Sequence, residues 1–204
     1  MLLVEINKQV QAGFSIPIFK SEMGDVEVLN KGLCEFLIGE QEKENAESRI
    51  DWRTTESIRQ NPLIEDVVSM FGNAISHLTR LETNMDIPPS DIQISADVWG
   101  SVSQCGLVKS MLNYSPLHWK GIYFVKCDSR TTIEIAPPYP PGLIHGTGKY
   151  ANQPTKIVLE ADTSTTIIFP ARLTHSITYG PGEGLNVAVE VASGVLLTEK
   201  ESAK

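Results

Sequence analysis

The stretch "DIQISADVW", Asp91–Trp99, decides the fold because the spacing of apolar residues changes there. From Ile92 onward, apolar residues occupy every second position, which is typical of a strand with one buried face. Before Asp91, apolar residues recur every three or four positions, which is typical of helices. The 204 residues therefore predict a single domain with a helical part over residues 1–90 and a β part over residues 91–204.

Further strand-like segments follow Asp91 and are separated by turn residues. They are "KGIYFVKC", "TTIEIA", "TKIVLEA", "TTIIFPA" and "LNVAVEVASGVLL". Between Ala136 and Gln153 the sequence is so rich in proline and glycine that it predicts a long loop. Many short strands at this spacing favour a sandwich or a barrel.

The first part of the chain predicts two helices, over residues 26–44 and 62–82. Asn61 is a suitable cap for the second helix, and Pro62 fits its first position. The segment "SIPIF", Ser15–Phe19, predicts a short edge strand interrupted by proline. We expect an α+β, mainly β fold with the helices packed on one sheet. An open sheet edge also predicts a homodimer.

Composition narrows the expected binding partners and the expected cellular compartment of the protein. A net charge of −8 argues against a nucleic acid or an anionic membrane as partner. No apolar stretch is long enough to span a bilayer, and the apolar start of the chain is too short for a secretory signal. Cys34, Cys105 and Cys127 form no CxxC motif, which favours a reducing cytoplasm. A small molecule is the expected ligand class.

Four features in order along the chain carry a family resemblance. They are "FSIPIF" at Phe14–Phe19, Trp52 before a long helix, "WGSVSQCGLVKSMLNYSPLHWKGIYFV" at Trp99–Val125, and "FPARLTH" at Phe169–His175. In this order and spacing the chain resembles the 2-oxoglutarate/Fe(II) oxygenases of the double-stranded β-helix (cupin-like) superfamily. The resemblance covers nearly the whole chain, and it implies a jelly-roll barrel.

The resemblance also implies a position for each residue of the family's metal site. That site is a facial triad, with two ligands from an H-x-H strand end and a third histidine from a later strand. His175 matches the third ligand, whereas Leu112 and Tyr114 occupy the first two positions. Asn186 stands at about the position of the arginine that anchors the cosubstrate, and Lys120 replaces a serine of the family. The implied metal site is therefore degenerate, with His175 as its one matching ligand.

A rebuilt metal site is an alternative. His118 follows on the same segment as Leu112, and it would combine with His175 and one carboxylate; His145, in the long loop, would fold over the opening. The candidate carboxylates near strand ends are Asp128, Glu134 and Glu190. The competing interpretation is that these histidines are hydrogen-bonding rim residues.

Two functions remain open. The first, which we favour, is a metal-free protein that binds a small molecule or a partner and needs no cofactor. Its expected ligand pocket consists of Tyr114, Lys120, Tyr123, Phe169, His175 and Asn186. These aromatic residues would equally suit an ordinary core. The second function is a working Fe(II)/2-oxoglutarate-dependent dioxygenase. In either case we expect His175 to point inward at the barrel mouth, beside Leu112 and Tyr114.

Overall fold

The structure is a computed structural model, and it describes residues 8–11, 14–44, 50–112, 114, 116–136 and 156–198. The helical elements are α1 (Glu27–Lys43), η1 (Pro62–Ile64), α2 (Glu65–Thr83) and η2 (Pro89–Asp91). The strands are β1 (Lys8–Gln11), β2 (Phe14–Pro17), β3 (Phe19–Glu22), β4 (Asp51–Arg53), β5 (Ile92–Gln104), β6 (Val108–Leu112), β7 (Trp119–Lys126), β8 (Thr131–Ala136), β9 (Ile157–Ala161), β10 (Thr165–Pro170), β11 (Thr174–Tyr179) and β12 (Leu185–Leu197). The loop expected between Ala136 and Gln153, with His145, lies outside the described residues.

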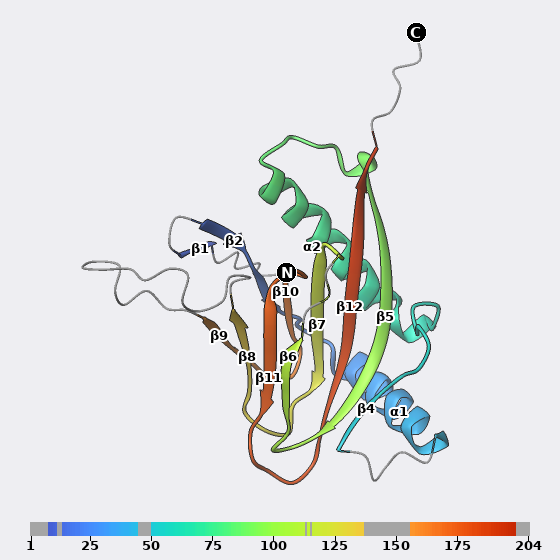
Figure 1. Ribbon diagram of the computed structural model, residues 1–204. Helices are drawn as coiled ribbons and strands as arrows, with labels where there is room; N and C mark the ends of the chain where they lie inside the picture. Colours follow the sequence, from blue (N-terminus) through green and yellow to red (C-terminus); the bar gives the residue numbers. More distant parts are fainter. Residues whose placement is uncertain are drawn as a thin grey trace, which may run out of the picture.

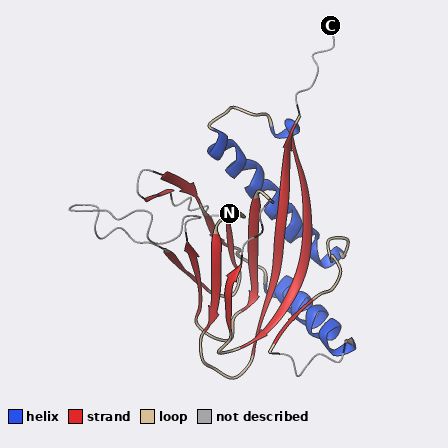
Figure 2. Ribbon diagram, in the orientation of Figure 1, coloured by secondary structure: helices blue, strands red, loops and turns tan. Residues whose placement is uncertain are grey.

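Two antiparallel sheets face each other (Figure 1). One has six strands in the order β3-β10-β7-β12-β5-β4, and the other has four in the order β6-β11-β8-β9. Figure 2 shows both long helices on the same side of the six-stranded sheet, away from the four-stranded sheet. The predicted α+β, mainly β barrel with helices on one sheet is therefore confirmed.

The second helix begins as its sequence predicts. Oδ1 of Asn61 accepts a hydrogen bond from the backbone N–H of Leu63 at 3.0 Å, and Pro62 opens the short turn η1 that leads into α2. The helix ends at Asn84, whose left-handed φ of 53° is a common way to stop a helix. Its buried stripe, which includes Val67, Phe71 and Leu78, faces the sheet.

The six-stranded sheet is buried on both faces. In β7, Tyr123 and Val125 pack with the helices, whereas Ile122 and Phe124 pack between the two sheets. Because neighbouring side chains of a strand point to opposite faces, β7 contributes to two separate cores. This double burial explains the unbroken apolar run in "GIYFV".

Each helix is seated over a glycine of the sheet. The side chain of Leu37, from α1, lies over Gly100 of β5, and the ring of Phe71, from α2, lies over Gly121 of β7. A methyl group built on either glycine would meet these buried side chains well inside contact distance. The two glycines therefore set how closely the helix layer approaches the sheet.

The two longest strands extend beyond the rest of the barrel. β5 and β12 pair continuously from Gln104–Leu185 to Ile92–Leu197, whereas β7 pairs with β12 only as far as Ser193. The ends of β5 and β12 therefore form a two-stranded extension, visible in Figure 1 beside α2. His118 borders this extension, because its Nδ1 accepts a hydrogen bond from the backbone N–H of Val195 at 2.9 Å.

The edges of the six-stranded sheet are β3 and β4. The segment expected as one edge strand, "SIPIF", is divided at Ile18 between β2 and β3, and β3 forms the edge beside β10. The expected homodimer stays a prediction.

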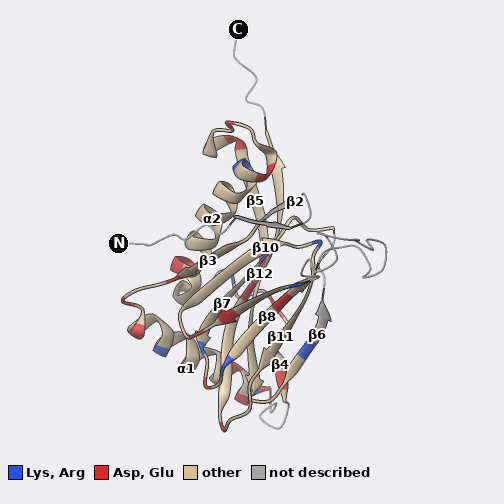
Figure 3. Cartoon of the chain, turned by 90° about the vertical axis from the view of Figure 1, so that its left-hand side faces the viewer, with Lys and Arg blue, Asp and Glu red and all other residues tan. Residues whose placement is uncertain are grey.

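Figure 3 shows acidic and basic residues interspersed along the described chain. No helix of the described chain is long and apolar enough to cross a membrane.

We expect Gly121→Ala to lower the free energy of unfolding by about 1–3 kcal/mol, because its methyl group would collide with the buried Phe71 ring. Gly39→Ala in α1 is the matched control, since a methyl group there meets nothing within 4 Å. It should raise the free energy of unfolding by about 0.5–1 kcal/mol through helix propensity alone. Urea unfolding measures both values, and a stabilising Gly121→Ala would contradict this seating of α2.

Candidate functional site

His175 lies near the start of β11, and its side chain faces Phe169 of the six-stranded sheet. In β11 it pairs with Leu112 of β6 on one side and with Ile135 of β8 on the other. Its side chain is only 1% exposed. The imidazole meets the Phe169 ring edge-on at 4.8 Å between centroids and stacks with the Tyr114 ring at 6.0 Å.

A fully buried lysine also contacts the Tyr114 ring. Lys120 is 0% exposed, and its side chain points into the barrel from β7. Its Nζ lies 4.2 Å from the ring centroid of Trp99 and 4.3 Å from that of Tyr114, and these two centroids are 5.7 Å apart. The ammonium group therefore lies against two neighbouring aromatic rings, an arrangement that stabilises a cation out of water.

Glu190 supplies the counter-charge for this lysine. Its Oε2 lies 2.7 Å from Nζ of Lys120, and its Oε1 accepts a hydrogen bond from Oγ of Ser101 at 3.1 Å. Lys120 and Glu190 lie on adjacent strands, with Glu190 paired to Ile122 and Lys120 paired to Ala192. The two charged side chains are thus diagonal neighbours on the barrel-facing side of the sheet.

A second lysine and a second carboxylate extend the network. Nζ of Lys109, on β6, lies 3.7 Å from Glu190 and 2.9 Å from Asp51 of β4. The exposed guanidinium of Arg53 covers the Trp99 ring at 3.5 Å. This network, which we call the charged cluster, consists of Arg53, Lys109, Lys120, Asp51 and Glu190. It holds three cationic groups and two carboxylates.

The electrostatics of the charged cluster follow from burial and from this surplus of cations. Burial alone would raise the pKa of Glu190, but the ammonium groups of Lys120 and Lys109 outweigh it and hold that pKa well below its usual range. Complete burial lowers the pKa of Lys120 to about 8, against the opposing effect of Glu190. Lys109 keeps two carboxylate partners, which overcome its burial and raise its pKa. Lys120 is therefore the cation that most readily loses its proton.

Burial also raises the pKa of two tyrosines in this part of the barrel. Tyr179, whose ring lies 5.9 Å from Nζ of Lys109, has a pKa raised to about 12. For Tyr114, burial raises the pKa against the opposing effect of Arg53 and Lys109. Both phenols are therefore neutral at physiological pH.

The structure separates the six expected pocket residues. Tyr114, Lys120, Phe169 and His175 lie together, as described above. Tyr123 does not join them, because it lies on the opposite face of β7 and its hydroxyl donates to Oδ1 of Asn30 in α1 at 2.6 Å.

Asn186 also lies away from His175. The next residue, Val187, pairs with Lys126, whereas Ser193 pairs with Trp119, so Asn186 is at the opposite end of β12 from the aromatic rings. Its side-chain oxygen accepts from the backbone N–H of Asp128 at 3.0 Å. This hydrogen bond joins the start of β12 to the turn between β7 and β8.

The residues of the rebuilt metal site are dispersed. Nδ1 of His118 is engaged by Val195, Asp128 pairs with Lys126 at 2.6 Å, and Glu134 pairs with Lys156 at 2.6 Å. The described part of the chain contains no group of three or more His, Cys, Asp or Glu placed to hold a metal ion.

The side chains around His175 do not fit a dication. The residue paired with it, Leu112, has no donor atom, and the neutral phenol of Tyr114 stacks with the imidazole. The ammonium of Lys120 lies 4.3 Å from the centre of the Tyr114 ring and adds no metal-binding atom while it carries its proton. A single imidazole cannot replace the missing donors of a facial triad.

The sequence analysis did not predict the ion pair between Lys120 and Glu190, and it did not place Lys109 or Arg53 near the site. The sequence does contain a signal for the Lys120–Glu190 pair. Lys120 stands beside the apolar run "GIYFV", and Glu190 is the one charge within "VAVEVA". Two opposite charges in strands that read as buried predict a buried ion pair, provided that the strands are adjacent.

No family model matches the sequence, and no curated protein matches it. Solved structures do share its fold. The HygX structure from Streptomyces hygroscopicus, with nickel and 2-oxoglutarate bound, is 8% identical, with a TM-score of 0.54 over 87% of this chain and 82% of that one. AviO1 from Streptomyces viridochromogenes Tue57 is 10% identical, with a TM-score of 0.54 over 92% and 91% of the two chains.

A prolyl-4-hydroxylase from Pseudomonas putida is a third example, at 5% identity, with a TM-score of 0.52 over 87% of this chain and 91% of that one. At these identities the likeness concerns the fold. The chain has the double-stranded β-helix fold of 2-oxoglutarate/Fe(II) oxygenases.

Proposed function

We propose that this protein is a metal-independent binding protein built on an oxygenase fold. The observation that carries the proposal is the buried ammonium of Lys120, held 2.7 Å from Glu190 and against the rings of Trp99 and Tyr114. In the family that the chain resembles, this end of the barrel holds a metal ion and an anionic cosubstrate. Here a cation of the chain and its own carboxylate lie beside these rings.

The ion pair also fits the presence of Asn186 at the position where the family has a cosubstrate-anchoring arginine. An anchoring arginine needs an anion as partner, whereas Lys120 is already neutralised by Glu190 within the barrel. A ligand carboxylate would have to displace Glu190 from a fully buried cation, and the displaced carboxylate would lose its partner. The interior pair therefore favours binding outside the barrel rather than inside it.

The ligand that best suits the mouth is a small planar anion. Arg53 is exposed and lies flat on Trp99, next to the half-buried Tyr114. The charged cluster has one more cation than carboxylates. A planar carboxylate would pair with the guanidinium fork of Arg53, which already covers the Trp99 ring.

Two related proposals concern assembly and compartment. Edge strands β3 and β4 support the proposal of a homodimer, and a monomer in light scattering at tens of micromolar would contradict it. The three free cysteines, Cys34, Cys105 and Cys127, support a reducing cytoplasmic location.

The first prediction concerns the ion pair. Glu190→Gln alone should lower the free energy of unfolding by about 3–5 kcal/mol, because it leaves Lys120 buried without its counter-charge. The double variant Lys120→Met/Glu190→Gln should recover most of this loss. Glu190, whose pKa is lowered, stabilises the fold above the ordinary carboxyl pKa, and this contribution is lost as the pH falls. Urea unfolding from pH 7 to pH 3 should therefore show a shallower acid loss in the double variant than in the wild type.

The second prediction concerns the metal. Leu112→His/Tyr114→His supplies the missing imidazoles, yet it should bind Co²⁺ weakly because the charged cluster holds one more cation than carboxylates. Adding Lys120→Met, which removes one cation and leaves the carboxylate of Glu190 in place, should tighten Co²⁺ binding by about tenfold or more. Visible absorption of bound Co²⁺ measures both. Stoichiometric iron in wild-type protein, with turnover of 2-oxoglutarate, would overturn the proposal in favour of the oxygenase.

The third prediction concerns the ligand. Benzoate should quench tryptophan fluorescence in the wild type and lose about tenfold in affinity in Arg53→Gln, because the guanidinium fork is removed. Arg130→Gln is the matched control, since Arg130 is an exposed arginine that pairs with Glu160 elsewhere on the barrel. Equal benzoate affinity in the two variants would exclude the mouth as the binding site.

A further inference from the structure

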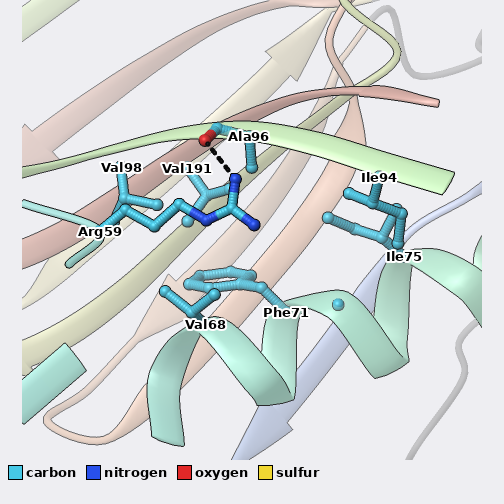
Figure 4. Close-up of a pocket in the computed structure, with 9 residues that line it drawn as sticks. Arg59, Val68, Phe71, Ile75, Ile94, Ala96, Val98 and Val191 are labelled. Carbon is cyan, nitrogen blue, oxygen red and sulfur yellow. Dashed lines mark hydrogen bonds between the residues drawn. The ribbon is translucent and has the colours of Figure 1, made fainter. Parts of the chain in front are cut away.

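A cavity lies on the opposite face of the six-stranded sheet from the charged cluster. It has a volume of about 80 Å³, lies between α2 and strands β5 and β12, and opens to solvent beside the exposed Arg59 (Figure 4). Six of its apolar lining residues face each other across it: Val68, Phe71 and Ile75 from α2, and Ile94, Ala96 and Val98 from β5. The walls are therefore aliphatic and aromatic.

A glycine leaves this space open. Gly72 lies in the middle of α2 and lines the cavity, and a methyl group built on it meets nothing within 4 Å. Glycine inside a helix costs about 0.5–1 kcal/mol relative to alanine, and an empty apolar space forgoes dispersion contacts. Alanine would fit here without a clash, so packing by itself does not require the glycine.

Arg59 stands at the cavity with unused hydrogen-bond donors. Figure 4 shows its guanidinium among the apolar side chains, with one bond drawn to Ala96. That bond, from Nη1 to the backbone oxygen, is long at 3.4 Å. Over the described ranges, no carboxylate forms an ion pair with Arg59. A guanidinium carries five N–H donors, so most of its capacity remains available.

We propose that this cavity binds a short aliphatic carboxylic acid in its ionised form. The hydrocarbon chain would fill the space beside Gly72, and the carboxylate would pair with the two-pronged guanidinium of Arg59. An apolar cavity of about 150 Å³ holds benzene. This cavity is about half that size, so it suits a chain of about three or four carbon atoms. The apolar walls select against polar metabolites, and Arg59 selects for an acid over an alcohol or an amine.

The experiment is a titration of the ¹⁵N-labelled full chain with butyrate, followed by amide chemical shifts. Butan-1-ol and butylamine test the need for the negative charge. We expect butyrate to shift amides of α2 and of residues 92–98 and to bind at least about tenfold more tightly than either neutral or cationic probe, because only butyrate pairs with Arg59.

Three variants separate binding from packing. Gly72→Ala should weaken butyrate binding by about fourfold, the effect of losing one methylene-sized space. Gly39→Ala is its matched control, because it makes the same change in a helix with open space around it but far from the cavity. It should leave the affinity unchanged. Arg59→Met keeps an apolar stem over the cavity and should weaken butyrate about tenfold without weakening butan-1-ol.

Either of two results would overturn the proposal. Equal affinity in Gly72→Ala and Gly39→Ala, or equal binding of butyrate and butan-1-ol, would show that the cavity is only a packing defect. Thermal unfolding of each variant checks that the fold is intact. Arg130→Gln should leave butyrate affinity unchanged, because Arg130 is an exposed arginine that pairs with Glu160 and does not line the cavity.

Discussion

The six-stranded sheet is covered on both faces, and this constraint shapes the rest of the molecule. Helices cover one face and the four-stranded sheet covers the other, so no side chain in the middle strands reaches water easily. A charge placed there has to find its partner within the protein. Lys120 and Glu190 satisfy that requirement together, with Ser101 completing the carboxylate's hydrogen bonds. Where a helix has to approach closely, the sheet provides a glycine.

The same constraint explains how one end of an oxygenase-like barrel has a different chemistry. A dication and an ammonium group cannot share a site a few ångströms across unless anions neutralise both. Among the described residues, Glu190 is the buried carboxylate, and two lysines lie against it. The rings of Trp99 and Tyr114 lie against the ammonium of Lys120. The likeness to oxygenases therefore concerns the fold, whereas the chemistry depends on the residues at this end of the barrel.

The fold could be predicted from local patterns, but the site could be predicted only in part. The alternation from Ile92 and the cap at Asn61 are local signals, and both the strand and the helix formed as expected. The position of His175 opposite Leu112 followed from family spacing. Tyr123 was assigned to the wrong face because β7 is apolar on both faces, so its sequence lacks the alternation that identifies the inward side.

The lysine–glutamate pair depends on strand order. Lys120 and Glu190 are 70 residues apart, and only the adjacency of β7 and β12 brings them together. Asn186 faces the barrel as its family position suggests, but strand length places it at the far end from His175. Neither fact is encoded by neighbouring residues, so neither could be read from the sequence without the topology.

The position of β12 has a consequence for how the chain folds. This strand is the last described in sequence, yet it lies in the centre of the larger sheet, between β7 and β5. Its pairing of Leu197 with Ile92 joins segments about a hundred residues apart, and such distant contacts form slowly because a long loop has to close first. Because β12 lies between them, β5 and β7 have no backbone pairing with each other. The two halves of the larger sheet, and the helices seated on them, are therefore joined by the strand that is the last described along the chain.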